Sequence, residues 1–275
     1  MSGNLFAAIF IGFFVLVIIA VVYSALIGQP RMRRRLKELS EQRGWTYTAG
    51  KSLIVSKRSV NGYLLSPQET ISNSIQGSDQ GIHWRIDGVT VESKVARKVV
   101  TTSGQVEDSP SNSIYQIIWH SEDVRIEHGS VLLFLKPEGW THDEGVGGML
   151  KAGLQSMYRE IIYDLMRRTY NIQNTPVKLG IPEFDAKYKV EVSDVGAVEV
   201  ALTSEVRDFL IQQRPPATLI QLGDNALDII AEDSTYFTKI EKFEKMAGLI
   251  HYGVQLAQVV AASQSAANPQ SDATA

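Results

Sequence analysis

The hydrophobic and polar positions of the chain divide it into an apolar opening, a short basic segment and a long mixed region. The apolar opening runs without interruption for 23 residues, Leu5 to Ile27, and sixteen of these are Leu, Ile, Val or Phe. As a helix this run would be about 34 Å long, and the hydrocarbon core of a bilayer is about 30 Å thick. Insertion is favoured by roughly 5 to 10 kcal/mol on transfer scales. The pattern therefore predicts a transmembrane anchor over residues 1–30.

Basic residues follow the apolar run directly. Residues 1–30 carry no charged side chain, and the next seven positions hold five cations, Arg31, Arg33, Arg34, Arg35 and Lys37. Cations beside a spanning helix resist translocation, so we expect the N-terminus outside and the C-terminal domain in the cytoplasm. A cleaved signal peptide is the main alternative, but its cations precede a shorter apolar core. We interpret the five cations as topology determinants, with a site for anionic lipid headgroups as the alternative.

A short basic helix is predicted over residues 31–44. Met32, Leu36 and Leu39 recur at the spacing of one apolar helical face. We expect Pro30 to end the spanning helix before it and Gly44 to close it.

Beyond Gly44 the pattern changes to short alternating runs that are typical of strands. They predict strands over residues 45–48, 53–55, 82–86, 89–100, 114–119 and 131–135. The strand over 89–100 alternates Val with Lys and Arg and is expected at an edge or facing solvent. The strands over 114–119 and 131–135 are expected to be neighbours in one sheet, and residues 101–113 to form a loop. From Gly148 the period becomes helical, through residue 168.

The second half of the soluble region shows a regular order of elements. Pro176, Gly180 and Pro182 mark a candidate boundary. After it we expect a strand over 188–192, a helix over 195–213, a hairpin of 219–222 and 226–231, and a helix from Thr238. The fold class is therefore α+β, an N-terminal transmembrane helix followed by a mostly antiparallel sheet domain with packed helices. The predicted divisions are an anchor (1–30), a basic juxtamembrane helix (31–44), an α+β region (45–175), a β-α-β-β-α subregion (176–262) and a disordered tail (263–275).

The composition of the chain excludes several classes of function. Hydrophobic residues make up 44% of the 275, so the chain is long and apolar enough for a buried core. Cysteine is absent, which excludes disulfides, thiolate metal sites and Cys nucleophiles. Removing the five juxtamembrane cations from the 27 basic residues leaves 22 against 30 acidic ones, a charge of −8. We therefore expect no nucleic-acid partner, because phosphates require clustered cations.

Candidate chemistry is sparse. Gly145, Gly147 and Gly148 precede the predicted helix, where a phosphate-binding turn would lie, but the spacing matches neither a dinucleotide fingerprint nor a P-loop. His142, Asp143 and Glu144 form a polar cluster in the same loop. Consecutive residues rarely ligate one ion, so we expect no metal and no cofactor, and interpret this cluster as solvated loop residues.

Other polar residues receive similar interpretations. His120, Glu122 and Asp123 form a second cluster, again interpreted as solvated. Asp194 is expected to cap the helix that follows it, and Asp185 to serve a turn. The four tryptophans are expected in the core or at the membrane interface. The small residues of the last helix, among them Gly248 and Gly253, are expected to pack on the domain, with another subunit as the alternative partner.

Several segments together resemble a known group of proteins. They are the uncharged anchor, the RMRRRLKEL flank, Gly44-Trp45 with Tyr47, and the stretch FDAKYKVEVSDVGAVEVALTSEVRDFL. The chain resembles a loose group of uncharacterised bacterial single-pass membrane proteins that carry a domain of unknown function. The resemblance covers most of the chain in layout. It implies a bacterial plasma (inner) membrane and no particular activity.

Three functions remain open from the sequence. The leading hypothesis is a membrane-tethered interaction or scaffold module at the cytoplasmic face, with the lipid bilayer and other membrane proteins as partners. The first alternative is a membrane-anchored hydrolase or nucleotide-dependent enzyme with a site near residues 140–148. The second alternative is a small accessory subunit of a larger membrane complex.

Overall fold

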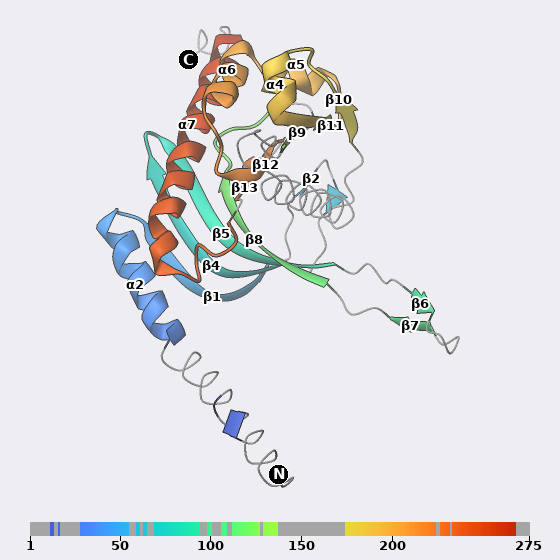
Figure 1. Cartoon of the computed structure of the whole chain (residues 1–275). Coiled ribbons are helices and arrows are strands. Elements are labelled where there is room, and N and C mark those ends of the chain that lie inside the picture. Colours follow the sequence, from blue (N-terminus) through green and yellow to red (C-terminus); the bar gives the residue numbers. More distant parts are fainter. Residues whose placement is uncertain are drawn as a thin grey trace, which may run out of the picture.

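The fold centres on one large antiparallel sheet. The computed structural model describes residues 12, 13, 16, 28–54, 59–60, 63–64, 69–93, 98–100, 106–108, 112–126, 129–136, 174–223, 226–231 and 233–267. Within these ranges nine strands form the sheet, in the order β1-β4-β5-β8-β13-β12-β9-β11-β10 (Figure 1). All of its neighbouring strands run antiparallel.

The strands of the sheet come from both sides of the predicted boundary at Pro176. They are β1 (Thr46–Ile54), β4 (Glu69–Asp79), β5 (Ile82–Ser93), β8 (Asn112–Ser121), β9 (Val131–Leu135), β10 (Thr175–Val177), β11 (Tyr188–Val192), β12 (Ala217–Leu222) and β13 (Leu227–Ala231). Two separate strand pairs are β2 (Ser59–Val60) with β3 (Tyr63–Leu64), and β6 (Lys98–Val100) with β7 (Val106–Asp108). The mostly antiparallel α+β fold predicted from the sequence is confirmed.

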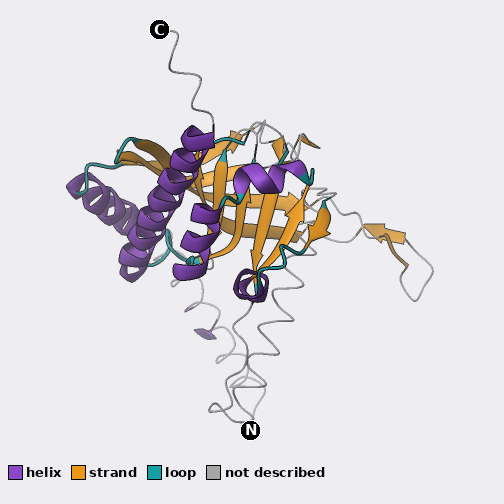
Figure 2. Ribbon diagram, turned by 90° about the horizontal axis from the view of Figure 1, so that it is seen from above, coloured by secondary structure: helices purple, strands orange, loops and turns teal. Residues whose placement is uncertain are grey.

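Helices cover one face of this sheet, as Figure 2 shows. They are α2 (Gln29–Gln42), α4 (Pro182–Lys187), α5 (Gly196–Ala201), α6 (Ser204–Gln212), the 3-10 turn η3 (Ile240–Lys242) and α7 (Phe243–Ala267). The longest of these, α7, crosses β5, β8 and β13, whereas α4 and α5 lie on β11 and β9.

The core lies between the helices and alternate residues of the strands. Ile117 and Trp119 of β8 and Ile229 of β13 are fully buried there, and they follow the two-residue period of a strand. The α7 backbone comes very close to Trp119, because a Cβ added at Gly253 would lie 2.5 Å from the indole ring. Gly253 therefore permits this contact, and the predicted packing of the small residues on the domain is confirmed at this position.

The basic helix α2 is part of the same core. Leu36 is fully buried, and Met32 and Leu39 pack against the core, so the predicted apolar face is confirmed. Gly44 follows the helix with φ of +74°, a left-handed conformation that suits glycine. Pro30 lies inside the first turn of α2, where a missing amide hydrogen removes no helical hydrogen bond. The predicted end of a spanning helix before Pro30 stays a prediction, because residues 17–27 lie outside the described residues.

Three sequence predictions about the sheet were wrong. First, β8 and β9 share the sheet but are separated by β13 and β12. Second, the stretch from Val89 continues β5, which is internal, and Val89 is fully buried. Third, β4 was missed, because its sequence ETISNSIQGSD offers only two apolar residues. Strand order depends on contacts between distant segments, which local patterns do not contain.

Two predictions about the helices also need correction. The helix expected over residues 195–213 is divided into α5 and α6 at Leu202 and Thr203. The tail expected to be disordered from Ser263 instead continues α7 to Ala267, with Ser263 buried. Asp194 has the predicted capping role, since its side chain accepts a hydrogen bond from the Gly196 amide at 2.7 Å.

Several predicted segments lie outside the described residues. They are the helix over 148–168, residues 268–275 and, apart from Gly12, Phe13 and Leu16, the apolar run. Of the helices in the described ranges, none has the length and apolar character needed to cross a membrane. The anchor over residues 1–30 therefore stays a prediction.

Candidate functional site

The sheet face opposite the helices carries a row of polar side chains that runs from strand to strand. Directly paired residues of antiparallel strands point to the same face. Register places the following residues side by side in one row: Arg85 of β5, His120 of β8, Asp228 of β13, Gln221 of β12, Leu132 of β9 and Glu191 of β11. We call this set the polar row. Four of its residues are buried, His120, Gln221, Leu132 and Glu191, and burial of a charged side chain such as Glu191 is unusual.

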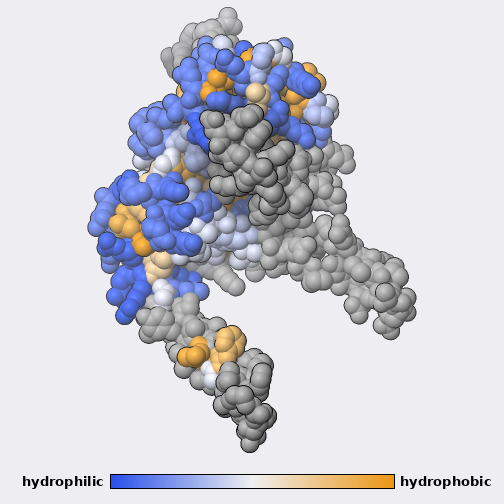
Figure 3. Space-filling view, viewed as in Figure 1, coloured by the Kyte–Doolittle hydropathy of each residue, from blue (hydrophilic) through white to orange (hydrophobic). Residues whose placement is uncertain are grey.

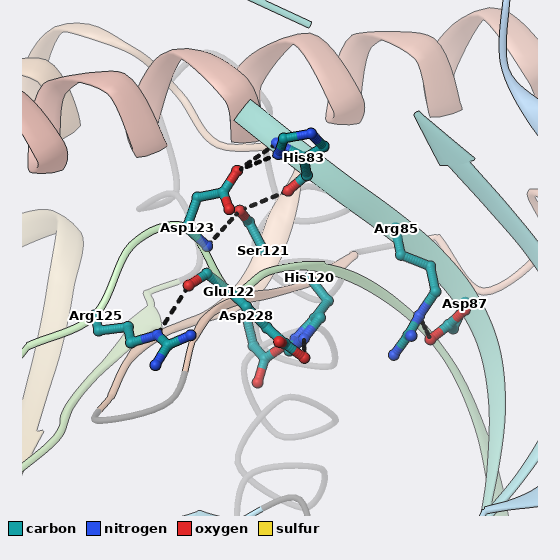
Figure 4. Close-up of polar contacts among 9 residues, drawn as sticks. All are labelled: His83, Arg85, Asp87, His120, Ser121, Glu122, Asp123, Arg125 and Asp228. Atoms are coloured by element: carbon teal, nitrogen blue, oxygen red, sulfur yellow. Dashed lines mark hydrogen bonds and ion pairs between the residues drawn. The ribbon is translucent and has the colours of Figure 1, made fainter. Parts of the chain in front are cut away.

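His120 lies near the centre of the polar row and is held by two carboxylates. Its Nδ1 is 2.6 Å from Asp228 Oδ1, and its Nε2 is 3.3 Å from Glu122 Oε1 (Figure 4). The His120 and Asp228 side chains are only 11% and 18% exposed, whereas that of Glu122 is 68% exposed. Asp228 therefore fixes the ring from the protein side. The other ring nitrogen faces the exposed carboxylate of Glu122 on the solvent side.

The buried carboxylates on this face have cationic partners on their own strands. Arg85 Nε donates to Asp87 Oδ2 at 2.8 Å, and the Asp87 side chain is fully buried. Lys189 Nζ lies 3.7 Å from Glu191 Oε1 in β11. Asp87, Glu191, Asp228 and Gln116 each have at least one further interaction. These contacts offset the desolvation of buried charges, which is large for an unpaired group.

A second histidine contact lies where β5 begins. Asp123 Oδ2 accepts from the His83 backbone amide at 2.5 Å and lies 3.1 Å from its ring Nδ1. The Ser121 hydroxyl donates to the His83 carbonyl at 2.7 Å. Figure 4 shows that these bonds tie the end of β8 to the start of β5. Ser121 is thereby engaged with the backbone and is not positioned as a nucleophile.

The cluster of His120, Glu122 and Asp123 therefore differs from the sequence interpretation. Solvated loop residues were expected, but His120 belongs to β8, is buried and pairs with a residue 108 positions away. The signal that sequence reasoning missed was the two-residue period of Gln116, Ile118 and His120, which places them on one face. No local pattern reveals that β13 lies beside them.

The five juxtamembrane cations are not among the residues of the polar row. His142, Asp143 and Glu144 lie outside the described residues. The five basic residues fall on α2, where Arg35 pairs with Glu38 at 3.2 Å and Lys37 with Glu41 at 3.7 Å. Asp185 serves a turn, because its carboxylate accepts from the Leu179 and Gly180 amides.

The interactions that the polar row offers are hydrogen bonds and ion pairs. Across the ranges that the structure describes, no three His, Asp or Glu side chains are placed to hold a metal ion. The row thus defines a class of site, a largely buried polar network on one face of a nine-stranded antiparallel α+β domain.

Comparison with known proteins adds little to this description. No protein-family model matches the chain, and no curated protein sequence matches it. A search of solved structures finds the mycobacterial trehalose monomycolate transport factor A, TtfA. It is 13% identical, with a TM-score of 0.45, over 83% of this chain and 95% of that protein. A similarity of this level supports no conclusion about function.

Proposed function

We propose that the chain is a membrane-tethered module that holds its α+β domain at the cytoplasmic face of the plasma membrane, for interaction with other membrane proteins. The observation that carries this proposal is the packing of the basic helix α2. Leu36 of α2 is fully buried in the core of the domain. Because of this packing, the segment next to the predicted anchor belongs to the folded domain and is not a flexible linker.

A second contact fastens the end of α2 to α7. Arg43 Nη2 donates to both carboxylate oxygens of Glu244, at 2.9 and 3.0 Å. The same guanidinium lies over the rings of Trp45 and Phe243, at 5.4 and 5.6 Å from their centroids. Such stacking adds to the ion pair. The tether and the domain would therefore move together.

Simple distances favour a domain that lies directly on the bilayer. A helix rises 1.5 Å per residue, so Leu36 would lie about 14 Å beyond Ile27. The headgroup layer on one side of a bilayer is roughly 5 to 8 Å thick. The domain would then begin just outside the headgroups. The exposed Phe13 and Leu16, at 63% and 66%, are compatible with side chains that face lipid.

The exposed surface of α2 suits this position. Figure 3 shows that the surface over α2 is mostly hydrophilic. Arg31, Arg33 and Arg34 are exposed, and no carboxylate pairs with them in the part of the chain described, in contrast to Arg35 and Lys37. Unpaired cations next to the predicted anchor favour a cytoplasmic orientation.

A reporter fusion tests the placement. We expect green fluorescent protein fused after Ala275 to fluoresce, and alkaline phosphatase at the same position to be inactive, because the domain stays in the cytoplasm. Sodium carbonate should leave the full chain in the membrane pellet. An active phosphatase fusion, or a mature chain that begins beyond Ile27, contradicts the proposal.

Photo-crosslinking in native membranes tests the interaction role. Val195 and Val200, at the start and within α5, are 66% and 47% exposed, which makes them the most exposed large apolar residues of the described domain. A crosslinking residue at either position should capture a discrete partner. Glu241, exposed in η3, is the matched control. Equal capture at all three positions, or none, counts against an interaction surface on α5.

The enzyme alternative has one observation in its favour, the buried His120–Asp228 pair. A hydrolase that used the loop near residues 140–148 would lose its cellular phenotype when His142, Asp143 and Glu144 are all replaced by alanine. If both this triple variant and His120→Gln retain the phenotype, the enzyme hypothesis is excluded. The accessory-subunit alternative predicts that the captured partner copurifies with the chain in a fixed ratio.

A further inference from the structure

A cleft lies on the helix-covered side of the molecule, away from the polar row. It has a volume of about 740 Å³ and lies between α7, the segment after α6 and the segment after β13. Pockets of roughly 300 to 1,000 Å³ are typical of small-molecule sites. Tyr236 and Tyr252 line the cleft and are 3% and 6% exposed, so its floor is packed. The Tyr252 ring is further supported by Phe209, at 5.5 Å between centroids.

One wall of the cleft is hollowed by a glycine that packing does not explain. Gly248 lines the cleft in the interior of α7, and a Cβ built there would meet no atom within 4 Å. Glycine inside a helix is less stable than alanine by about 1 kcal/mol. At Gly253, by contrast, the Trp119 ring leaves no room for a side chain. A side chain added at Gly248 would therefore project into open space at the cleft.

The charges around the cleft favour an anionic ligand. Lys245 and His251 flank Gly248, one helical turn away on each side, and Arg214 lines the cleft from the segment after α6. The one acidic residue among the cleft-lining residues described is Asp233, whose carboxylate lies 2.8 Å from Lys242 Nζ. The Thr235 amide also donates to Asp233, at 2.8 Å. Because Asp233 is paired with Lys242, Lys245 gives the α7 wall of the cleft a positive character.

We propose that this cleft binds a small molecule with a phosphate or carboxylate group, which Lys245 and Arg214 hold while its apolar part lies against Gly248 and the two tyrosines. Charge-assisted hydrogen bonds are the stronger kind and give orientation. The packed floor and the open backbone leave space for a flat apolar body. Neither the membrane anchor nor the polar row is needed for this site.

Ligand-observed NMR with phenyl phosphate tests the site in the full chain, purified in a neutral detergent. We expect saturable binding in the millimolar range, and no comparable binding of benzylamine, which has the same ring and the opposite charge. Lys245→Ala should weaken binding about tenfold, the order expected for a lost hydrogen bond to a charged group. Lys178→Ala, which removes an exposed lysine outside the cleft, is the matched control and should leave the affinity unchanged.

Occlusion tests the location independently of charge. Gly248→Phe places a large side chain in the cleft and should abolish binding, whereas Gly248→Ala should change the affinity by less than about threefold, since it adds one methyl group where nothing lies within 4 Å. Circular dichroism verifies that both variants are folded. Absence of saturable binding in the wild type, equal binding of benzylamine, or full binding by both Gly248→Phe and Lys245→Ala overturns the proposal.

The same assay separates two sources of the anionic group. If the ligand is a lipid headgroup, short-chain phosphatidylglycerol should compete with phenyl phosphate, and phosphatidylcholine should not. If it is a soluble metabolite, inorganic phosphate should compete and neither lipid should. Both results support an anion site in the cleft and identify where the anion comes from. Failure of all competitors against a probe that does bind overturns the assignment of the phosphate to Lys245.

Discussion

Two glycines of α7 provide a sharp test of the packing, because the same substitution should have opposite effects at the two positions. At Gly253, an added Cβ would lie 2.5, 2.6 and 2.9 Å from three atoms of the Trp119 ring, which is fully buried. At Gly248, five residues earlier in the same helix, the added Cβ meets nothing within 4 Å.

The magnitudes follow from two opposing effects. Alanine in a helix interior is favoured over glycine by about 1 kcal/mol. Overpacking a filled core costs about 1 to 3 kcal/mol, and three contacts under 3 Å with a ring that cannot move outward place Gly253→Ala at the upper end. We therefore expect Gly253→Ala to lower the free energy of unfolding by about 1 to 2 kcal/mol. Gly248→Ala should raise it by about 0.5 to 1 kcal/mol.

Urea unfolding of the full chain in neutral detergent, followed by tryptophan fluorescence, measures both changes. Trp119 is fully buried, so its emission reports loss of the contact with α7. The midpoint should fall for Gly253→Ala and rise for Gly248→Ala, with similar slopes. A stabilising effect of both substitutions refutes the close approach of α7 to β8, because the helix-propensity term alone would then account for the data.

Four further outcomes follow from polar groups that are wholly or partly buried. His120→Phe should lower the free energy of unfolding by about 1 to 3 kcal/mol, since it removes a hydrogen-bond partner from Asp228, whose side chain is only 18% exposed. Adding Asp228→Asn should recover part of the loss in urea unfolding, and no recovery contradicts the pairing. Burial disfavours ionised Asp233, but hydrogen bonds from Lys242 and Thr235 outweigh it and lower its pKa to about 2 from the usual 3.8. A lowered carboxylate pKa stabilises the fold at higher pH, so the difference in melting temperature between wild type and Asp233→Asn should be present at pH 6 and fade between pH 4 and pH 2. Tyr188→Phe should cost about 1 kcal/mol, because the hydroxyl donates to the Leu210 carbonyl at 2.9 Å. Burial also raises the pKa of Tyr188, Tyr47, Tyr115 and Tyr252, so an absorbance titration at high pH should show a late group of tyrosines.

Elements with a strong local period could be predicted from the sequence. The apolar stripe of α7 and the short apolar runs of β12 and β13 are properties of a few neighbouring residues. Both strands appear within two residues of the expected ranges, whereas α7 begins at Phe243 and not at the expected Thr238. The strand β4 could not be found in this way, because it is polar and obtains its stability from pairing with β1 and β5. Local patterns also placed β9 beside β8, since they contain no information on the later hairpin that lies between them.

The polar row was beyond prediction for the same reason. His120 and Asp228 each occupy an unremarkable position in the sequence, and only the register between β8 and β13 brings them to 2.6 Å. The burial pattern of one strand does not specify which other strand will pair with it. The cleft has a comparable origin, because Arg214, Asp233 and Lys245 come from three separate segments that meet only in the folded chain.

The helix α7 connects the features from which the function is argued. Its first turn holds Glu244, the partner of Arg43 at the end of α2, and its middle carries Lys245, Gly248 and His251 in the cleft. From Glu244 to His251 the helix rises only about 10 Å, and no break in α7 separates the two contacts. A rigid helix transmits a displacement along its length, whereas a loop would absorb it. An anion that displaces α7 from the cleft side would therefore also displace Glu244, the partner of Arg43. Arg43→Ala should change the stability of the chain by less than about 1 kcal/mol. The same substitution should weaken any effect of cleft occupancy on the position of α2.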